Sequence, residues 1–198
     1  MKGIFYVLVS TFMLLGNMQL SQADDQLTTL NETLSIYRQA VLDNDFDTAL
    51  DLTYPSIFTL APRAEMQAGL EQMAASGQAP QVKKVLTEVN PLIRDFSNGV
   101  FTTINTDIEM VLNSPDPDNA EVNDFLLTTL KTQMGADSNV SYNAEEASFN
   151  IQKQGLFVAI NEADSGWKFF DYEQALSAPE ASKLLPADIL EALASTNE

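Results

Sequence analysis

The sequence predicts an α+β domain in which N-terminal helices pack on one face of an antiparallel sheet. Three patterns support this prediction. Apolar residues recur at helical spacing from residue 27 to residue 77. From residue 100 to residue 112 they alternate with mostly polar residues, as in a strand that buries one face. The strand-like runs after residue 82 are mostly joined by short turns, which connect antiparallel neighbours.

Residues 1–23 have the composition of a secretory signal peptide. Lys2 precedes an apolar run from Ile4 to about Gly16, and the small residues Ser21 and Ala23 follow. The run is shorter than the roughly 20 residues that a membrane-spanning helix needs, so we favour cleavage over a retained anchor. The chain has no cysteine to carry a lipid. We therefore expect an exported protein, periplasmic or secreted, with residues 24–198 as a single domain.

The first helix is expected to begin at the capping-box spacing of Thr29 and Glu32 and to end near Asp43. Its apolar face would consist of Leu27, Leu30, Leu34, Tyr37 and Val41.

Residues 45–77 would then form two helical pieces that serve as an apolar lid on the sheet. Tyr54-Pro55 interrupts them, because proline disfavours a helical residue before it. The second piece would begin at Pro62 and end at Gly77, where a positive φ is allowed. It would carry inward Met66, Leu70 and Met73.

Strand patterns follow in a regular order. Val85 to Val89 reads as a strand, which continues from Pro91 to Phe96 after a break, and Asn98-Gly99 is a strong hairpin signal. After the strand at 100–112, residues 121–134 are interpreted as an inserted helix that closes at Gly135. The later strands are expected at 140–142, 147–153, 156–163 and 167–172, with turns at 154–155 and 164–166, and a C-terminal helix is expected from Pro186.

This order of elements resembles the nuclear transport factor 2-like superfamily, and it is closest to the exported bacterial branch. The residues that carry the resemblance are the interruption Tyr54-Pro55-Ser56-Ile57-Phe58 and the ending Ser165-Gly166-Trp167-Lys168-Phe169-Phe170. The resemblance covers most of residues 27–172 and implies a cone-like fold, with a curved sheet around a pocket under the helices. The superfamily includes ketosteroid isomerase, small hydratases and cyclases, and modules without catalysis. No enzyme motif matches position by position, so the resemblance assigns no catalytic residue.

The net charge of −18 excludes some partners. It repels phosphate backbones and anionic lipid headgroups, and the basic residues form no run longer than Lys83-Lys84. We expect no nucleic-acid binding and no membrane binding after signal cleavage. An alternative explanation is that the negative charge only keeps an exported protein soluble.

The residue inventory limits the possible chemistry. Histidine and cysteine are absent, which excludes Ser-His-Asp and Cys-His catalysis and the usual zinc ligands. A carboxylate could act as a base if a pocket raises its pKa, and Asp107 and Glu109 on the polar side of the clearest strand are the candidates. Weaker candidates for lining a ligand cavity are Tyr54, Phe58, Arg94 and Tyr142. The alternative is that the carboxylates face solvent and the aromatic residues serve packing.

Two acidic clusters are candidate calcium sites. Asp43, Asp45 and Asp47 alternate as calcium ligands do, but Thr48 and Tyr54 stand where the loop needs glycine and glutamate. We expect a helix cap and turn there, and a solvated loop that caps a helix at Asp116, Asp118 and Glu121. No metal and no cofactor is predicted.

The leading functional hypothesis is a non-enzymatic exported domain that binds a small apolar ligand in its cavity or a protein partner on its sheet. One alternative is a carboxylate-based isomerase or hydratase that uses Asp107 or Glu109. The other is a homodimer formed through the open face of the sheet.

Overall fold

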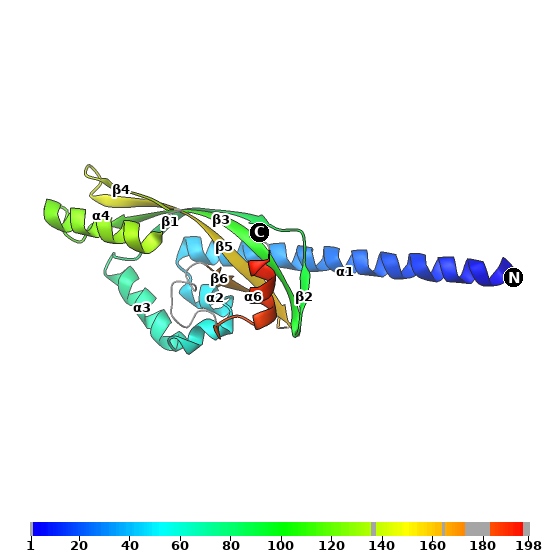
Figure 1. Cartoon of the computed structure of the whole chain (residues 1–198). Helices are drawn as coiled ribbons and strands as arrows, with labels where there is room; N and C mark the ends of the chain where they lie inside the picture. The colour runs from blue at the N-terminus through cyan, green and yellow to red at the C-terminus, as the bar shows by residue number, and fades with distance from the viewer. Residues whose placement is uncertain (1, 136–137, 164, 173–182, 196–198) are drawn as a thin grey trace. The chain divides into compact units, whose positions relative to one another are not determined.

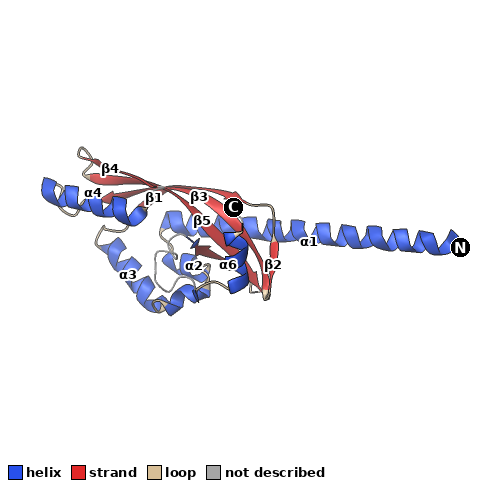
Figure 2. Cartoon of the chain, in the orientation of Figure 1, coloured by secondary structure: helices blue, strands red, loops and turns tan. Residues whose placement is uncertain are grey.

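The computed structural model describes residues 2–135, 138–163, 165–172 and 183–195, with side chains from residue 23 onward. The predicted α+β class is confirmed, because helices at both ends of the chain accompany a curved six-stranded antiparallel sheet that is not closed (Figures 1 and 2). The chain divides into two compact units, residues 1–36 and residues 37–198. The first unit is part of a single helix, and the second contains the sheet.

Helix α1, Lys2–Asp43, is continuous. The predicted start at Thr29 is wrong, because the Thr29 hydroxyl donates to the Gln26 carbonyl and the Thr33 hydroxyl donates to the Thr29 carbonyl, as inside a helix. No glycine or proline lies between Gly16 and Thr29 to stop the helix earlier. The predicted end at Asp43 is confirmed. Within the described part of the chain, no helix combines the length and the apolar character required to cross a membrane.

Three short helical elements follow α1. Helix α2, Phe46–Asp51, begins at Asp45, whose carboxylate accepts the Thr48 N–H at 3.2 Å, so the predicted cap is confirmed. The predicted interruption is also present, as the 3-10 helix η1, Pro55–Thr59. Helix α3, Arg63–Ala75, starts after Pro62 and is followed by Gly77 with φ 72°. None of its residues is fully buried: Met66 and Leu70 are half-buried and Met73 is 39% exposed, so the predicted inward face is present only in part.

The sheet is built on two long central strands, β3, Gly99–Asn113, and β5, Ser148–Glu162. They pair along their whole length, from Gly99 opposite Glu162 to Asn113 opposite Ser148. The predicted turn at Gln154-Gly155 is wrong: β5 continues through it, because both of its halves pair with one uninterrupted β3. The Thr106 hydroxyl donates to the Gly155 carbonyl at 3.1 Å across this pairing.

Each outer edge of the sheet holds two shorter strands. On one side β1, Gln81–Val89, and β2, Arg94–Phe96, pair with successive parts of β3. On the other side β4, Ser138–Asn143, and β6, Trp167–Asp171, pair with successive parts of β5. The first hairpin turn is Ser97-Asn98, one residue earlier than predicted, because Phe96 pairs with Gly99. Helix α4, Ala120–Met134, is the predicted insertion between strands.

Both faces of the sheet are covered in the part formed by β6 and the paired ends of β3 and β5. On one face the ring of Tyr37, near the end of α1, lies 4.9 Å from that of Phe169 and 6.2 Å from that of Phe157, between centroids. On the other face Phe101 and Phe170 form a core with helix α6, Ala187–Ala194. The sequence predicts helices on one face only. The structure differs because the predicted C-terminal helix returns to cover the side of β3 that carries Phe101.

Replacing Gly99 with alanine is expected to destabilise the fold. A Cβ atom at residue 99 would collide with the backbone of Asn161 on β5. Relieving that overlap requires the central ladder to move, at a cost of about 1–3 kcal/mol in the free energy of unfolding measured with urea. Gly69→Ala is the matched control, since nothing lies within 4 Å of its Cβ position and alanine favours the helix. Equal stability of Gly99→Ala and the parent protein would contradict this packing.

Stability is expected to fall as the pH rises from about 10 to about 12. Burial and the nearby charge of Asp171 raise the pKa of Tyr37 from 10.0 to about 12. A pKa raised by folding stabilises the protein below the unfolded-state pKa, and that contribution is lost as the pH rises through the folded-state value. Tyr37→Phe should flatten this part of the stability profile, by on the order of 2 kcal/mol. Parallel profiles of the variant and the parent in urea titrations would refute the assignment.

Candidate functional site

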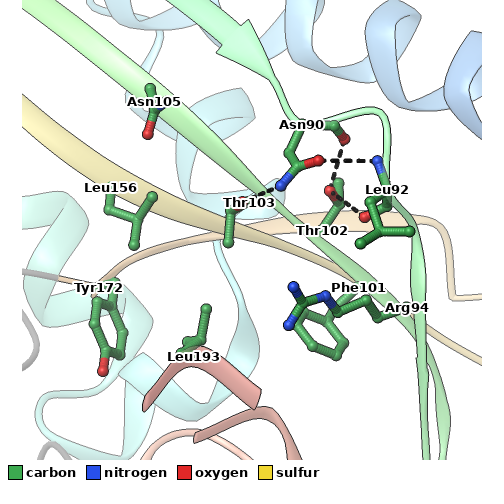
Figure 3. A pocket seen from close by; sticks show the side chains of 10 residues that line it. All are labelled: Asn90, Leu92, Arg94, Phe101, Thr102, Thr103, Asn105, Leu156, Tyr172 and Leu193. Atoms are coloured by element: carbon green, nitrogen blue, oxygen red, sulfur yellow. Dashed lines mark hydrogen bonds between the residues drawn. The ribbon is translucent and has the colours of Figure 1, made fainter. Parts of the chain in front are cut away.

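The structure contains a partly enclosed cavity of about 250 Å³ on the sheet face that α6 covers (Figure 3). Strand β3, the connection from β1 to β2, strand β5 and α6 all contribute to its wall. The lining residues that the structure describes are Asn90, Leu92, Arg94, Phe101, Thr102, Thr103, Asn105, Leu156, Tyr172 and Leu193.

Pro91 creates one side of the cavity. Proline lacks the N–H group that a strand donates to its neighbour, so the chain leaves β3 after β1 and returns only at β2. Hydrogen bonds hold the loop beside the sheet. The Thr102 hydroxyl lies 2.8 Å from the Asn90 carbonyl and 3.0 Å from the Leu92 carbonyl, and the Asn90 side chain accepts the Leu92 N–H and donates to the Thr103 hydroxyl.

Helix α6 closes another side, and the β2 hairpin holds both of its ends. Near its N-terminus the Asp188 carboxylate accepts the Ser97 N–H at 2.7 Å, and this bond lowers the pKa of Asp188. Near its C-terminus the Arg94 guanidinium donates to the Ala192 carbonyl at 3.2 Å. Between these ends Ile189 and Leu193 are buried against the sheet. Cavity and helix are therefore positioned by the same hairpin.

Arg94 gives the cavity its electrostatic character. Among the lining residues that the structure describes, it is the one with a formal charge at neutral pH. The chain as a whole carries a net charge of −18.

Tyr54, another predicted site residue, lies in the core beside the cavity. It is 8% exposed and packs in the same cluster as Phe101 and Leu193, but it does not line the wall. Its hydroxyl donates to the Glu162 carboxylate at 2.7 Å. Burial and this bond raise the pKa of Tyr54, so the phenol remains protonated well above neutral pH. Phe58, in η1, is half-buried and also does not line the cavity.

Asp107 and Glu109 lie further along β3, on the same face as Asn105 but beyond the cavity wall. Asp107 accepts an N–H of Gln152 at 3.2 Å. Glu109 forms a 2.7 Å ion pair with Lys84, and both of these side chains are more than two-fifths exposed. A carboxylate that acts as a general base works from a pocket that excludes water, whereas Asp107 and Glu109 are partly exposed. Their surroundings give no support to the enzyme hypothesis.

This polar half of the face is also where a partner or a second copy would dock on the open sheet. It includes one large exposed apolar side chain, Leu86, which is 48% exposed. Its neighbours on paired strands are Lys84, Asp107, Glu109 and Gln152. Interface cores are depleted of charged residues, so this surface does not have the composition of a stable dimer interface.

Tyr142 lies on the opposite face of the sheet, where it belongs to a buried polar network. Asn123 on α4 is 3% exposed, and its amide donates to the Tyr142 hydroxyl at 3.0 Å and to the carbonyls of Asp116 and Pro117. The Ser114 hydroxyl donates to Asn123 at 2.6 Å. Tyr142 therefore anchors the inserted helix and does not belong to the cavity.

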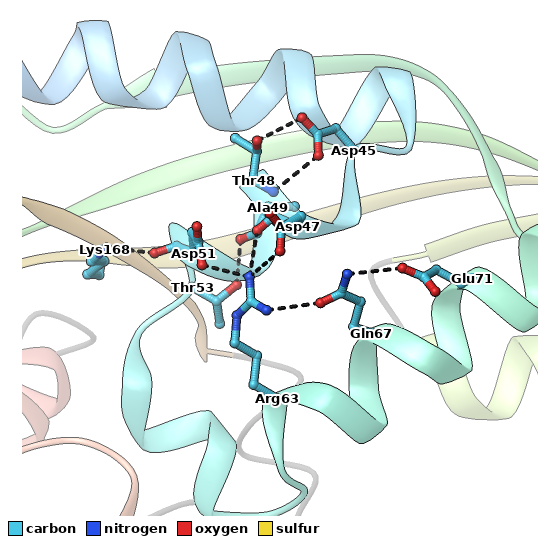
Figure 4. A network of polar contacts seen from close by, with 10 residues as sticks. All are labelled: Asp45, Asp47, Thr48, Ala49, Asp51, Thr53, Arg63, Gln67, Glu71 and Lys168. Carbon is cyan, nitrogen blue, oxygen red and sulfur yellow. Dashed lines mark hydrogen bonds and ion pairs between the residues drawn. The ribbon is translucent and has the colours of Figure 1, made fainter.

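Acidic side chains near α2 are held by a cation from the chain itself (Figure 4). The Arg63 guanidinium lies 2.7 Å from the Asp47 carboxylate and 2.6 Å from that of Asp51, and it also donates to Gln67. This network joins α2 to the start of α3. In the described part of the chain, no group of three or more acidic side chains has an arrangement that could hold a metal ion.

The sequence therefore identified one of the cavity-lining residues in advance, Arg94. The others come from elements far apart in the chain, and the signal that could have located them is the break at Pro91 together with the apolar face of the C-terminal helix.

Comparisons of the chain with protein-family models, with curated proteins and with solved structures found no match.

Replacing Asn123 with alanine is expected to lower the free energy of unfolding by about 3 kcal/mol, because it leaves several buried polar groups without their partner. Thermal and urea unfolding measure this loss. Asn139→Ala, an exposed position on β4, is the matched control and should change stability by no more than about 0.5 kcal/mol. Similar values for the two variants would show that the network does not hold α4.

Proposed function

We propose that this chain is an exported, non-enzymatic domain that binds a small, largely apolar molecule in the cavity between the β2–β3 hairpin and α6. The observation that carries the proposal is the cavity itself: a hollow beside the core with apolar walls and a few polar groups is the usual form of a ligand site. Leu92, Phe101, Leu156 and Leu193 supply the apolar surface.

The size of the cavity limits the ligand. Its volume of about 250 Å³ lies just below the range of about 300–1,000 Å³ typical of sites for drug-sized molecules. An apolar cavity of about 150 Å³ holds a benzene molecule. One aromatic ring or a short alkyl chain with a polar end therefore fits the available volume.

The composition of the wall favours binding over catalysis. The titratable groups among its described residues are Arg94 and Tyr172, and neither is a usual general base at neutral pH. Export is part of the proposal because of the signal-like composition of residues 1–23. The likeness in element order to the nuclear transport factor 2-like superfamily, which includes modules without catalysis, agrees with a binding role.

Methyl NMR spectra of the protein during titration with two neutral probes, phenylacetamide and hexanamide, test the proposal. We expect the Leu156 and Leu193 methyl signals to shift, because both side chains line the cavity. Leu156→Trp should suppress the shift at Leu193 by filling the cavity. Leu86→Trp adds the same bulk at an exposed position outside the cavity and should leave the shift unchanged.

Mass spectrometry of protein purified from its native compartment complements the titration by detecting a co-purifying small molecule. If no small molecule co-purifies and neither probe moves the cavity methyl signals, the proposed function is wrong.

A further inference from the structure

We propose that two copies of this chain associate through strand β1, which pairs antiparallel with its own copy around a two-fold axis at Leu86. Strand β1 stands at one end of the strand order, and among the strands that the structure describes it pairs with β3 alone. An edge strand presents backbone N–H and C=O groups that a further strand can pair with. This association goes beyond the proposed ligand site, because none of the residues at the axis lines the cavity.

One face of β1 carries a charge pattern that complements itself. Lys84, Leu86 and Glu88 share this face, since they lie opposite Glu109, Asp107 and Asn105 on β3. All three side chains are exposed. When the strand pairs with its copy around Leu86, each Lys84 lies opposite the partner's Glu88. Opposite charges that face each other across an antiparallel pair attract, so both symmetry-related contacts favour association.

The neighbouring strand extends this row of charges. Lys84 forms a 2.7 Å ion pair with Glu109 on β3. In the dimer the same ammonium would lie between Glu109 and the partner's Glu88. Within one chain Glu88 has a neutral residue, Asn105, opposite it on β3. Association therefore gives Glu88 a cationic neighbour and leaves the existing ion pair in place.

The apolar side chains also match across the axis. Leu86, which is 48% exposed, would meet the partner's Leu86 and lose part of that exposed surface. On the opposite face of β1, Val85 would lie across from the partner's Thr87, and such β-branched side chains suit paired strands. Docking on the open face of the sheet requires an apolar patch, whereas edge pairing gains most of its affinity from backbone hydrogen bonds.

Two features of β1 could oppose pairing, because lysine residues and bulges often protect edge strands. The irregularity in β1 lies between Val82 and Lys84, at the end of the proposed ladder from Lys84 to Glu88. Charges of one sign would repel, but here the signs are opposite on the two sides of Leu86. The ladder is short, so we expect a weak dimer with a dissociation constant on the order of 100 µM.

Sedimentation equilibrium measures this dissociation constant in the parent protein and in charge variants. A salt concentration of about 0.15 M limits the repulsion between two acidic chains. Lys84→Glu and Glu88→Lys each place like charges opposite one another twice, so each should weaken the dimer by about tenfold or more. An equimolar mixture of the two variants should associate again, because opposite charges then face each other. Lys131→Glu, at an exposed position on α4, is the matched control and should not change the dissociation constant.

A cross-linking experiment locates the axis. The chain has no cysteine, so Leu86→Cys introduces a single thiol. Residues directly opposite in an antiparallel pair have Cα atoms about 4.5–5.5 Å apart, which a disulfide can bridge. Leu86→Cys should therefore form a covalent dimer under mild oxidation. Phe125→Cys, at a 70% exposed position on α4, is the control and should cross-link more slowly.

A parent protein that remains monomeric up to about 1 mM, a weak limit for specific association, would overturn the proposal. A dimer that Lys84→Glu does not weaken, or a mixture of the two charge variants that stays monomeric, would overturn it as well. Melting temperatures check that each variant folds. If a charge variant does not fold, the parent protein and the rate of cross-linking in Leu86→Cys decide the question.

Discussion

The structure depends on the uninterrupted pairing of β3 with β5. Each strand has 15 residues, and their register runs without a shift from one end to the other. No edge strand matches this length, so each edge is filled by two shorter strands in succession. The interval between β1 and β2 contains Pro91, and there the chain loops away from the ladder. The cavity beside that loop is thus a consequence of a long central ladder with an interrupted edge.

The second organising feature is the return of the C-terminal helix. Helix α6 covers the part of the face that carries Phe101 and Phe170, and the face remains polar further along, at Asp107 and Glu109. One strand face therefore contributes both a buried core and a hydrated surface. Arg94 lies near the boundary, where it contacts the last turn of α6 and lines the cavity.

The candidate site was only partly predictable from the sequence. Arg94 was among the predicted cavity residues, and it does line the cavity. Tyr54 was correctly associated with this region of the fold, but its hydroxyl is used by Glu162 in the core. Asp107 and Glu109 could not be distinguished from cavity residues, since alternation assigns a face and does not show how far a covering helix extends. Tyr142 was misplaced because the register that puts it opposite Phe149, and so on the other face, is a property of strand pairing.

The sequence by itself determined the local features: the end of α1, the Asp45 cap, the interruption at Tyr54-Pro55, the inserted helix and the order of helices and strands. These depend on periodicity, on proline and glycine, and on side chains that bond to nearby backbone. Tertiary structure decided that β5 continues through Gly155, that α3 contributes no buried residue, and that α6 covers the sheet in its place. The reason is that these outcomes depend on contacts between residues far apart in the chain, which can override local preferences for a turn or a buried helix.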